Sequence, residues 1–383
     1  MAIETFTIKV PESALADLKR RLKDARWPDE IANERWERGT NLAYLRALVA
    51  YWQDGYDWRK EEAALNRLPQ FKLALDGLGI HFVHVRGKGP RPFPLIISHG
   101  WPGSFVEMRR LIPLLADPAA HGGKAEDAFD VVVPSLPGYG FSYAPRAAGM
   151  SPSAVAALWV RLMAALGYER FGAQGGDWGA AVSSAIGLDH PRQLIGLHLN
   201  FIAGRFLLGG TINEPAEDEI AAAYLAELRR WWDAEGGYNH EHSTKPQTLG
   251  YALNDSPLGL AAWIVEKFHR WSDCAGDPNR LFGRDELLTN VMIYWMGANI
   301  TASMRLYYES RERPLRLSRD SRVSAPTAVA LFPKEIPLPP RPLAERGYNI
   351  RRWTEMPRGG HFAAMEQPEL LADDVRAFFR ELR

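Results

Sequence analysis

Two hydrophobic periodicities alternate along the middle of this 383-residue chain. Short apolar runs typical of strands are separated by longer segments in which apolar residues recur at helical spacing. The expected strands lie at 92–99, 129–138, 171–174 and 194–201, and the expected helices lie at 104–117, 151–167 and 177–191. Repeated strand–helix units of this kind predict an α/β protein whose mostly parallel sheet carries helices on both faces.

The pattern differs at the two ends and in one long insertion. Residues 1–70 read as mostly helical, with helices over 41–52 and 58–68, and predict a packing arm. Strand-like segments TAVALFP and NIRRWTEM return after residue 319 and precede a C-terminal helix. We therefore expect an N-terminal helical arm at 1–70, a core at 71–205 and 320–383, and a helical cap at 206–319.

The expected cap is rich in aromatic residues, which fits a lid over an apolar pocket. Ordinary helix packing explains most of the same tryptophans equally well. The aromatic side chains in question are Trp231, Trp232, Trp263, Trp271, Trp295, Tyr224, Tyr238, Tyr294, Tyr307 and Tyr308.

Composition narrows the function classes. Lys+Arg and Asp+Glu both number 46, and without a long basic run or a known motif we expect no nucleic-acid partner. Cys274 is the single cysteine, so an internal disulfide is impossible and a cysteine-ligated zinc site is not expected. The chain shows neither a signal peptide nor a membrane-spanning stretch, which predicts a cytoplasmic protein without a membrane anchor.

The segment GGDWGA, residues 175–180, follows a strand and opens a helix. Serine hydrolases place their nucleophile in this setting, as Gly-x-Ser-x-Gly, but here the middle residue is Asp177. A carboxylate can attack an electrophilic sp³ carbon and form an ester. The alternative is an aspartate that caps the helix N-terminus. A serine esterase is excluded, because no serine stands at this position.

Two further motifs complete the arrangement of an α/β-hydrolase. HGWPGS, residues 99–104, follows a strand, so the backbone N–H groups of Trp101 and Trp178 would form an oxyanion hole. Pro102 would fix this loop, and a cis bond after Trp101 is an option. An ordinary turn before a helix explains HGWPGS alone equally well.

His361 lies in the glycine-rich segment RGGHFAAMEQPE, where the chain order of nucleophile, acid and histidine expects the base. Glu335, just past the strand TAVALFP, is the expected acid, whereas Asp320 and Glu345 are less well placed.

Together, GGDWGA, HGWPGS and RGGHFAAMEQPE resemble the epoxide hydrolases of the microsomal and juvenile-hormone type, which have the α/β-hydrolase fold. LKRRLKDARWPDE and YDWRKEEAALNRLPQF resemble the N-terminal segment of that family. ALNDSPLGLAAWIVEKFHRWSD and LLTNVMIYWMGANITASMRLYYE resemble its cap, so the similarity covers nearly the whole chain.

The resemblance implies a nucleophile at Asp177, a base at His361, an acid at Glu335 and two tyrosines that hold the epoxide oxygen. These tyrosines fall on Tyr238 and Tyr307, with Tyr308 as the neighbouring option for the second. The implied reaction converts an apolar or aryl epoxide to a vicinal diol through an ester of the nucleophile. It needs a small-molecule epoxide, water and no metal or other cofactor. The membrane anchor of the animal members is not expected here.

Two other functions compete with this interpretation. A haloalkane dehalogenase also uses an aspartate and a histidine on this fold, but it has no use for a pair of phenols. A non-catalytic ligand receptor on a hydrolase scaffold would tolerate loss of a triad member, whereas all the parts are present here. The substrate, a role in detoxification or in secondary metabolism, and the oligomeric state, a homodimer included, stay open.

Overall fold

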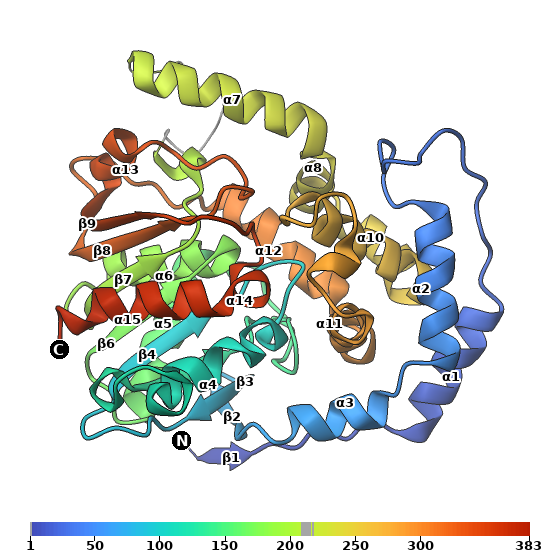
Figure 1. Cartoon of the computed structure of the whole chain (residues 1–383), viewed down its shortest axis with the longest axis horizontal. Helices are drawn as coiled ribbons and strands as arrows, with labels where there is room; N and C mark the ends of the chain where they lie inside the picture. The colour runs from blue at the N-terminus through green and yellow to red at the C-terminus, as the bar shows by residue number, and fades with distance from the viewer. Residues whose placement is uncertain (1, 208–215, 217) are drawn as a thin grey trace.

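The fold is built on one sheet, which carries nine strands in the described part of the chain (Figure 1). The computed structural model describes residues 2–207, 216 and 218–383. The strands are β1 (Ile3–Thr5), β2 (Gln70–Leu75), β3 (Leu78–Val85), β4 (Phe93–Ser98), β5 (Phe129–Pro134), β6 (Phe171–Gly175), β7 (Leu194–Leu199), β8 (Val323–Leu331) and β9 (Tyr348–Glu355).

The sheet is mostly parallel, which confirms the predicted class. Its order is β1-β2-β3-β5-β4-β6-β7-β8-β9. The pairs from β5 through β9 are parallel, and β1, β2 and β3 add an antiparallel edge. Since β4 and β6 are neighbours, the loops that follow these two strands meet at the carboxyl edge, where α/β proteins place their sites.

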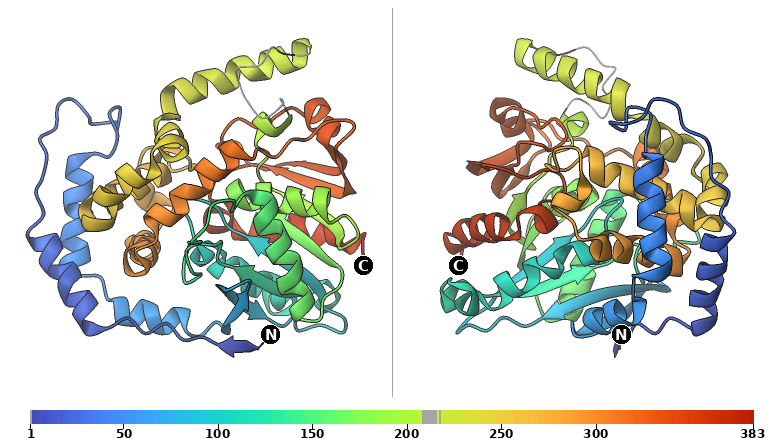
Figure 2. Two further views of the ribbon diagram at one scale, coloured as in Figure 1. Left: turned by 180° about the vertical axis from the view of Figure 1, so that it is seen from behind. Right: turned by 45° about the vertical axis from the view of Figure 1, so that its right-hand side comes forward.

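Helices cover both faces of the sheet. Helices α4 and α15 lie against one face and α5 and α6 against the other (Figures 1 and 2). The core helices are α4 (Leu111–Ala116), α5 (Pro152–Ala165), α6 (Asp177–Asp189), α13 (Arg341–Gly347), α14 (Ala363–Glu366) and α15 (Pro368–Arg380). Short 3₁₀ turns are η1 (Phe105–Arg109), η2 (Pro118–His121), η3 (Ala125–Asp127), η4 (Gly204–Leu207) and η5 (Pro278–Arg280).

A helical block lies between β7 and β8, in the region predicted as a cap. It contains α7 (Glu219–Glu235), α8 (Gly237–Thr244), α9 (Pro246–Asp255), α10 (Pro257–Arg270), α11 (Arg284–Gly297) and α12 (Ile300–Glu312). Residues 208–215 and 217 of the predicted cap, 206–319, lie outside the described residues.

The N-terminal segment begins at the edge of the sheet, beside β2, and then runs along the cap (Figures 1 and 2). It contains α1 (Glu12–Lys23), α2 (Leu42–Asp54) and α3 (Trp58–Leu65). The Tyr51 hydroxyl donates to Asp285 at 2.7 Å, and the ring of Trp36 stacks on His269 with centroids 4.2 Å apart. These contacts join α2 to α11 and the loop before α2 to α10, so this segment braces the cap.

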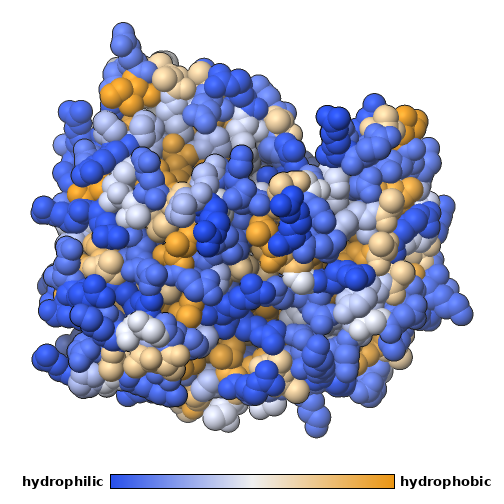
Figure 3. All heavy atoms as spheres, in the orientation of Figure 1, coloured by the Kyte–Doolittle hydropathy of each residue, from blue (hydrophilic) through white to orange (hydrophobic). Residues whose placement is uncertain are grey.

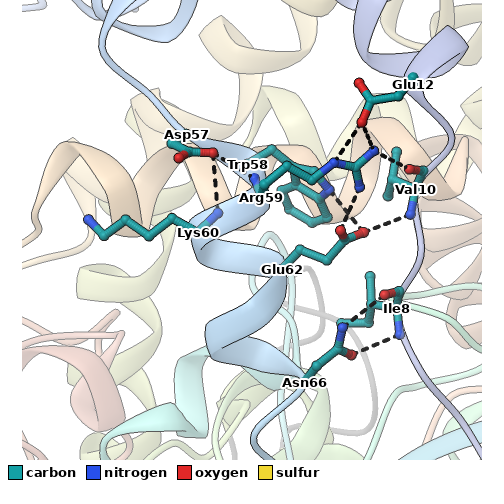
Figure 4. A network of polar contacts seen from close by, with 9 residues as sticks. All are labelled: Ile8, Val10, Glu12, Asp57, Trp58, Arg59, Lys60, Glu62 and Asn66. Atoms are coloured by element: carbon teal, nitrogen blue, oxygen red, sulfur yellow. Dashed lines mark hydrogen bonds and ion pairs between the residues drawn. The ribbon is translucent and has the colours of Figure 1, made fainter.

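Side chains of α3 and of its C-cap residue, Asn66, bind the extended backbone that follows β1 (Figure 4). The Glu62 carboxylate accepts from the Val10 N–H at 2.7 Å, and the Asn66 side chain bonds both the N–H and the carbonyl of Ile8. Buried backbone groups need such partners, because an unpaired one loses its bonds to water without replacement. The polar side chains of α3 and its C-cap therefore supply hydrogen bonds to this backbone, as a neighbouring strand would in a sheet.

One strand was missed and one local prediction was wrong. The arm, expected as mostly helical, contains α1, α2 and α3 but also β1, and a strand of three residues carries too little pattern to be recognised. The single helix expected over 104–117 is instead η1 followed by α4. Pro113 explains the break, since proline has no N–H for the Arg109 carbonyl and its ring crowds that carbonyl.

The face of the molecule in Figure 3 is largely hydrophilic, with apolar residues scattered over it. Among the residues described, no helix combines the length and the apolar character that crossing a membrane requires.

The contact between α6 and β4 leaves no room for a side chain at Gly179. A Cβ there would lie 1.9 Å from the Ser98 carbonyl oxygen, which is backbone and cannot rotate away. We expect Gly179→Ala to destabilise the fold by about 1–3 kcal/mol, as overpacking does. Urea unfolding would measure this. Gly237→Ala is the matched control, because a Cβ at Gly237 meets nothing within 4 Å. Equal stability of the two variants would contradict the prediction.

Candidate active site

Asp177 occupies a sharp turn between β6 and α6. Its φ is +47°, in the left-handed region that costs a non-glycine residue about 1–3 kcal/mol. Close approach of the backbone on both sides fixes this turn, since a Cβ at Gly175 would lie 2.3 Å from the Gly179 carbonyl oxygen. A Cβ at Gly100 would likewise lie 2.3 Å from the Asp177 Cβ. The Asp177 side chain is thus raised above the sheet edge and is 16% exposed.

The loop after β4 presents a backbone donor to this carboxylate. The Trp101 N–H donates to Asp177 Oδ1 at 2.8 Å, and the Trp101–Pro102 peptide bond is cis. Trp178 is the second residue of α6, and the first N–H groups of a helix have no carbonyl acceptor within it. Both amides named from the sequence therefore belong to backbone segments that flank the Asp177 carboxylate.

His361 and Glu335 form a buried pair behind Asp177. His361 Nδ1 and Glu335 Oε1 are 2.5 Å apart, and His361 Nε2 lies 3.6 Å from Asp177 Oδ2. Glu335 Oε1 also accepts from the Ile336 N–H at 2.7 Å, which fixes the carboxylate. Glu335 follows β8 and His361 follows β9, so adjacent parallel strands bring the two residues together.

The His361 loop is attached to the segment that follows cap helix α10. The His361 N–H donates to the Trp271 carbonyl at 2.8 Å, and the Gly359 N–H donates to Asp273 at 3.0 Å. Glu366 accepts from the N–H groups of Asp273 and Phe362, at 2.9 and 3.0 Å. The loop is therefore held from the cap side as well as from the core.

Two tyrosines face Asp177 from the cap helices α8 and α12. Tyr238 stacks on Trp101 with centroids 5.3 Å apart, and Tyr307 meets Trp178 edge to face at 4.7 Å. The two phenol rings are 5.9 Å apart. Tyr307 is buried, whereas its neighbour Tyr308 is 41% exposed, so the structure puts Tyr307 and not Tyr308 at the site.

A mainly apolar cavity lies between the cap and Asp177. Both tyrosines line it, and Asn239 is a further polar residue of its wall. Its remaining lining residues are Trp178, Ala181, Phe201, Ala203, Gly204, Phe206, Tyr224, Leu228, Trp231, Trp232, Ile336 and Pro337. A carboxylate and two phenols facing an apolar cavity suit a ligand with one polar atom and a hydrophobic body.

Comparisons with known proteins agree with this geometry. Residues 3–108 match the model for the epoxide hydrolase N terminus, and residues 94–212 match that for the alpha/beta hydrolase fold. A relative from Stigmatella aurantiaca is 46% identical over 100% of this chain and 86% of its own length. Epoxide hydrolase 1 of Oryctolagus cuniculus is 39% identical over 98% of this chain and 88% of its own length.

The chain belongs to the epoxide hydrolase family. It is accordingly a hydrolase that acts on epoxides. The crystal structure of juvenile hormone epoxide hydrolase from Bombyx mori matches with a TM-score of 0.85 and 33% identity, covering 100% of this chain and 95% of that one. The whole fold of this epoxide hydrolase, arm and cap included, is thus shared with a solved structure.

Sequence reasoning missed two buried carboxylates beside the pair of His361 and Glu335. Glu107 lies in η1 and Glu366 in α14, and both side chains are largely buried. Glu366 carried a signal, because it is a charged residue after the apolar run FAAM next to His361, whereas Glu107 is followed by Arg109 and Arg110 and carried none. The unused acid candidates lie elsewhere: Glu345 pairs with Arg341 on α13, and Asp320 is exposed. Among the described residues, no group of His, Cys, Asp or Glu could hold a metal ion.

The carboxylates around His361 control its protonation. Burial lowers the pKa of His361, but the charge and hydrogen bond of Glu335, then the charges of Asp177 and Glu107, outweigh burial and raise this pKa to about 9. Burial raises the pKa of Tyr307 well above its usual value, and the nearby Tyr238 and Asp177 add to the effect. Near neutral pH the unliganded epoxide hydrolase therefore holds an imidazolium beside Asp177 and a protonated phenol at Tyr307.

This electrostatic arrangement predicts the titration of His361. In the ligand-free protein its imidazole should titrate at about 9, and Glu335→Gln should lower that pKa because the largest favourable charge is removed. NMR of the histidine side chains would measure both values. Glu345→Gln, which removes an exposed carboxylate on α13, should leave the pKa unchanged.

The same shift links pH to stability. Because the folded-state pKa lies above the usual 6.5, the contribution of His361 to the free energy of unfolding is fully present below pH 6.5. It is lost as the pH rises through about 9. The stability difference between wild type and Glu335→Gln should therefore shrink over this interval in urea unfolding. A constant difference would contradict the assignment.

Proposed function

We propose that this epoxide hydrolase converts an apolar or aryl epoxide to a vicinal diol through an ester formed on Asp177. His361 and Glu335 activate the water that hydrolyses the ester. One observation carries the proposal: Asp177 faces Tyr238 and Tyr307 across an apolar cavity, and His361 Nε2 lies 3.6 Å from the same carboxylate.

In the first step Asp177 attacks a ring carbon of the epoxide. Oδ1 already accepts the Trp101 N–H, so we assign the attack to Oδ2. A new bond forms between Oδ2 and carbon while the ring C–O bond breaks. The leaving oxygen is a basic alkoxide, and the two phenols hold it by hydrogen bonds while one of them supplies its proton. Clamping the ring between carboxylate and phenols also aligns it for in-line attack.

In the second step water hydrolyses the ester. His361 Nε2 takes a proton from the water as its oxygen bonds to the Asp177 Cγ, and Glu335 holds the imidazole through Nδ1. Negative charge develops on Oδ1 between the amides of Trp101 and Trp178, where each donor can contribute about 3 kcal/mol. Collapse of the tetrahedral intermediate breaks the bond from Cγ to Oδ2, the ester oxygen, which leaves with the product. The diol then leaves, and its second hydroxyl carries the proton from His361. The other water proton, left on the Asp177 carboxyl, replaces the proton that the phenol gave up, so the enzyme regains its resting protonation.

The chemistry explains why aspartate stands where other hydrolases have serine. Ring strain makes an sp³ carbon electrophilic enough for a carboxylate, and the carbonyl that is hydrolysed belongs to the enzyme itself. The apolar wall of the cavity, with Trp231 and Trp232 among its residues, favours hydrophobic or aryl epoxides over small polar ones.

The first test is diol production from a panel of aryl and alkyl epoxides, with matched chloroalkanes alongside. We expect diol from epoxides only, and Asp177→Ala should reduce it to the uncatalysed rate because no ester can form. Asp320→Ala, an exposed carboxylate away from the cavity, is the control that should keep full activity. Activity in Asp177→Ala would refute the mechanism. Halide release without diol would indicate a dehalogenase, and tight binding without turnover would indicate a receptor.

The second test concerns the two phenols. Tyr238→Phe and Tyr307→Phe should each slow ester formation by about 10- to 100-fold, because each removes a hydrogen bond made to the developing alkoxide. Ester hydrolysis should change less. Tyr308→Phe is the matched control on the exposed side of α12. Stopped-flow tryptophan fluorescence under single-turnover conditions separates the two steps, and unchanged alkylation in both variants would show that the tyrosines are misassigned.

A further inference from the structure

A second, smaller cavity also reaches Asp177, and neither Tyr238 nor Tyr307 lines it. Asp177 and His361 line it together with Glu107, Gln174 and Asn200. Asp177 is the one described residue found in the walls of both cavities. The second cavity has a volume of about 20 Å³, and a water molecule needs about 10–15 Å³. It can therefore hold one water in contact with the groups that hydrolyse the ester.

The wall of this cavity carries two acceptor atoms that have no hydrogen-bond partner among the described residues. Glu107 Oε1 and Gln174 Oε1 are both buried and make no hydrogen bond. The Gln174 amide is oriented by its donation to Asn200 Oδ1 at 2.8 Å, which leaves its oxygen as the open acceptor. Buried polar atoms without a protein partner are usually satisfied by an ordered water with two to four contacts.

The backbone places the Glu107 carboxyl over the loop that ends in η1. A Cβ at Gly103 would lie only 1.6 Å from Glu107 Oε1, so the carboxyl folds back into space that a side chain would fill. Glu107 is 8% exposed, and within the described part of the chain no arginine or lysine pairs with it, since the nearby Arg109 pairs with Glu61. Backbone groups of Gly100 and Ser104 hydrogen-bond the carboxyl and hold it against the loop, whereas Oε1 has no hydrogen-bond partner in the structure as described.

The charges of this cavity change when Asp177 is esterified. Burial is the main cause that raises the pKa of Glu107, to about 8; the charge of His361 lowers it and that of Asp177 raises it. An ester carries no charge, so alkylation removes the Asp177 contribution from both Glu107 and His361. His361 thereby loses one of the charges that raised its pKa, so it can pass its proton to the phenolate left by alkylation and act as a base. This change favours the water-attack step over the alkylation step.

We propose that this cavity holds the hydrolytic water and that Glu107 orients it between His361 and the Asp177 Cγ. This rests on the proposed ester mechanism. One hydrogen of the water passes to His361 Nε2 while its oxygen bonds to Cγ, and the other hydrogen is held by Glu107. The ester C–O bond breaks, and the alkoxide of the product takes the proton from His361. Water and substrate thus reach Asp177 from separate cavities, and the bound product does not block the attack.

The test compares Glu107→Leu and Glu107→Gln with wild type in single turnovers of styrene oxide. Tryptophan fluorescence follows alkylation, and mass spectrometry of acid-quenched protein measures the ester. We expect both variants to alkylate within about twofold of the wild-type rate. Ester hydrolysis should slow about tenfold or more in Glu107→Leu and about threefold in Glu107→Gln, whose amide oxygen is still an acceptor. In steady state kcat and KM should fall together, leaving kcat/KM unchanged.

Glu62→Gln is the matched control, because Glu62 is a buried glutamate on α3, remote from both cavities. It should leave both rates unchanged. Wild-type hydrolysis in a folded Glu107 variant would overturn the inference, as would equal slowing of alkylation and hydrolysis, which a merely structural role produces. If Glu107→Leu does not fold, Glu107→Gln decides alone. Absence of an ester in the wild type would instead refute the proposed mechanism, so the two failures are distinguishable.

Discussion

The site depends on a backbone constraint at the end of β6. Asp177 has a left-handed φ in a turn where Gly175 and Gly179 carry no side chain, so that α6 packs closely against the sheet. Gly179 lies against the Ser98 carbonyl, and Gly175 lies against Gly179. This packing brings the start of α6 next to the loop after β4, and the Trp101 amide reaches the Asp177 carboxylate as a result. Nucleophile position and oxyanion donors are therefore consequences of the same close contact, held by the folding energy of the core.

The three buried glutamates near His361 have different roles because they have different hydrogen-bond partners. Glu335 is bonded to His361 and to a backbone amide, so its role is to orient and charge the imidazole. Both carboxylate oxygens of Glu366 accept hydrogen bonds from backbone amides, which stabilises the His361 loop. Glu107 has neither kind of partner at Oε1. Carboxyls within one small region thus differ in function because they differ in hydrogen bonding, and burial alone does not distinguish them.

The sequence pattern predicted those features of the fold and site that depend on neighbouring residues in the chain. Alternating periodicity predicted the parallel sheet, and glycine-rich turns after strands pointed to Asp177 and His361. Tyr238 and Tyr307 came from family resemblance, because nothing in their own segments distinguishes them from packing aromatics. The break at Pro113 was readable in principle, whereas β1 exists only through its pairing with β2. Glu107 could not be found from spacing, since its position depends on how the loop folds back over Gly103.

The contacts of the His361 loop suggest why arm and cap are shared across the family along with the core. The loop is hydrogen-bonded to the Trp271 carbonyl and to the Asp273 side chain, both just after α10. Helix α10 is in turn contacted by the N-terminal segment, through Trp36 on His269 and Thr40 on the Ala262 carbonyl. A cap that moved as a loose lid would displace the base together with the tyrosines. Contacts from the arm therefore keep the base, the phenols and the nucleophile in fixed positions relative to one another. A two-step reaction at one carboxylate requires this.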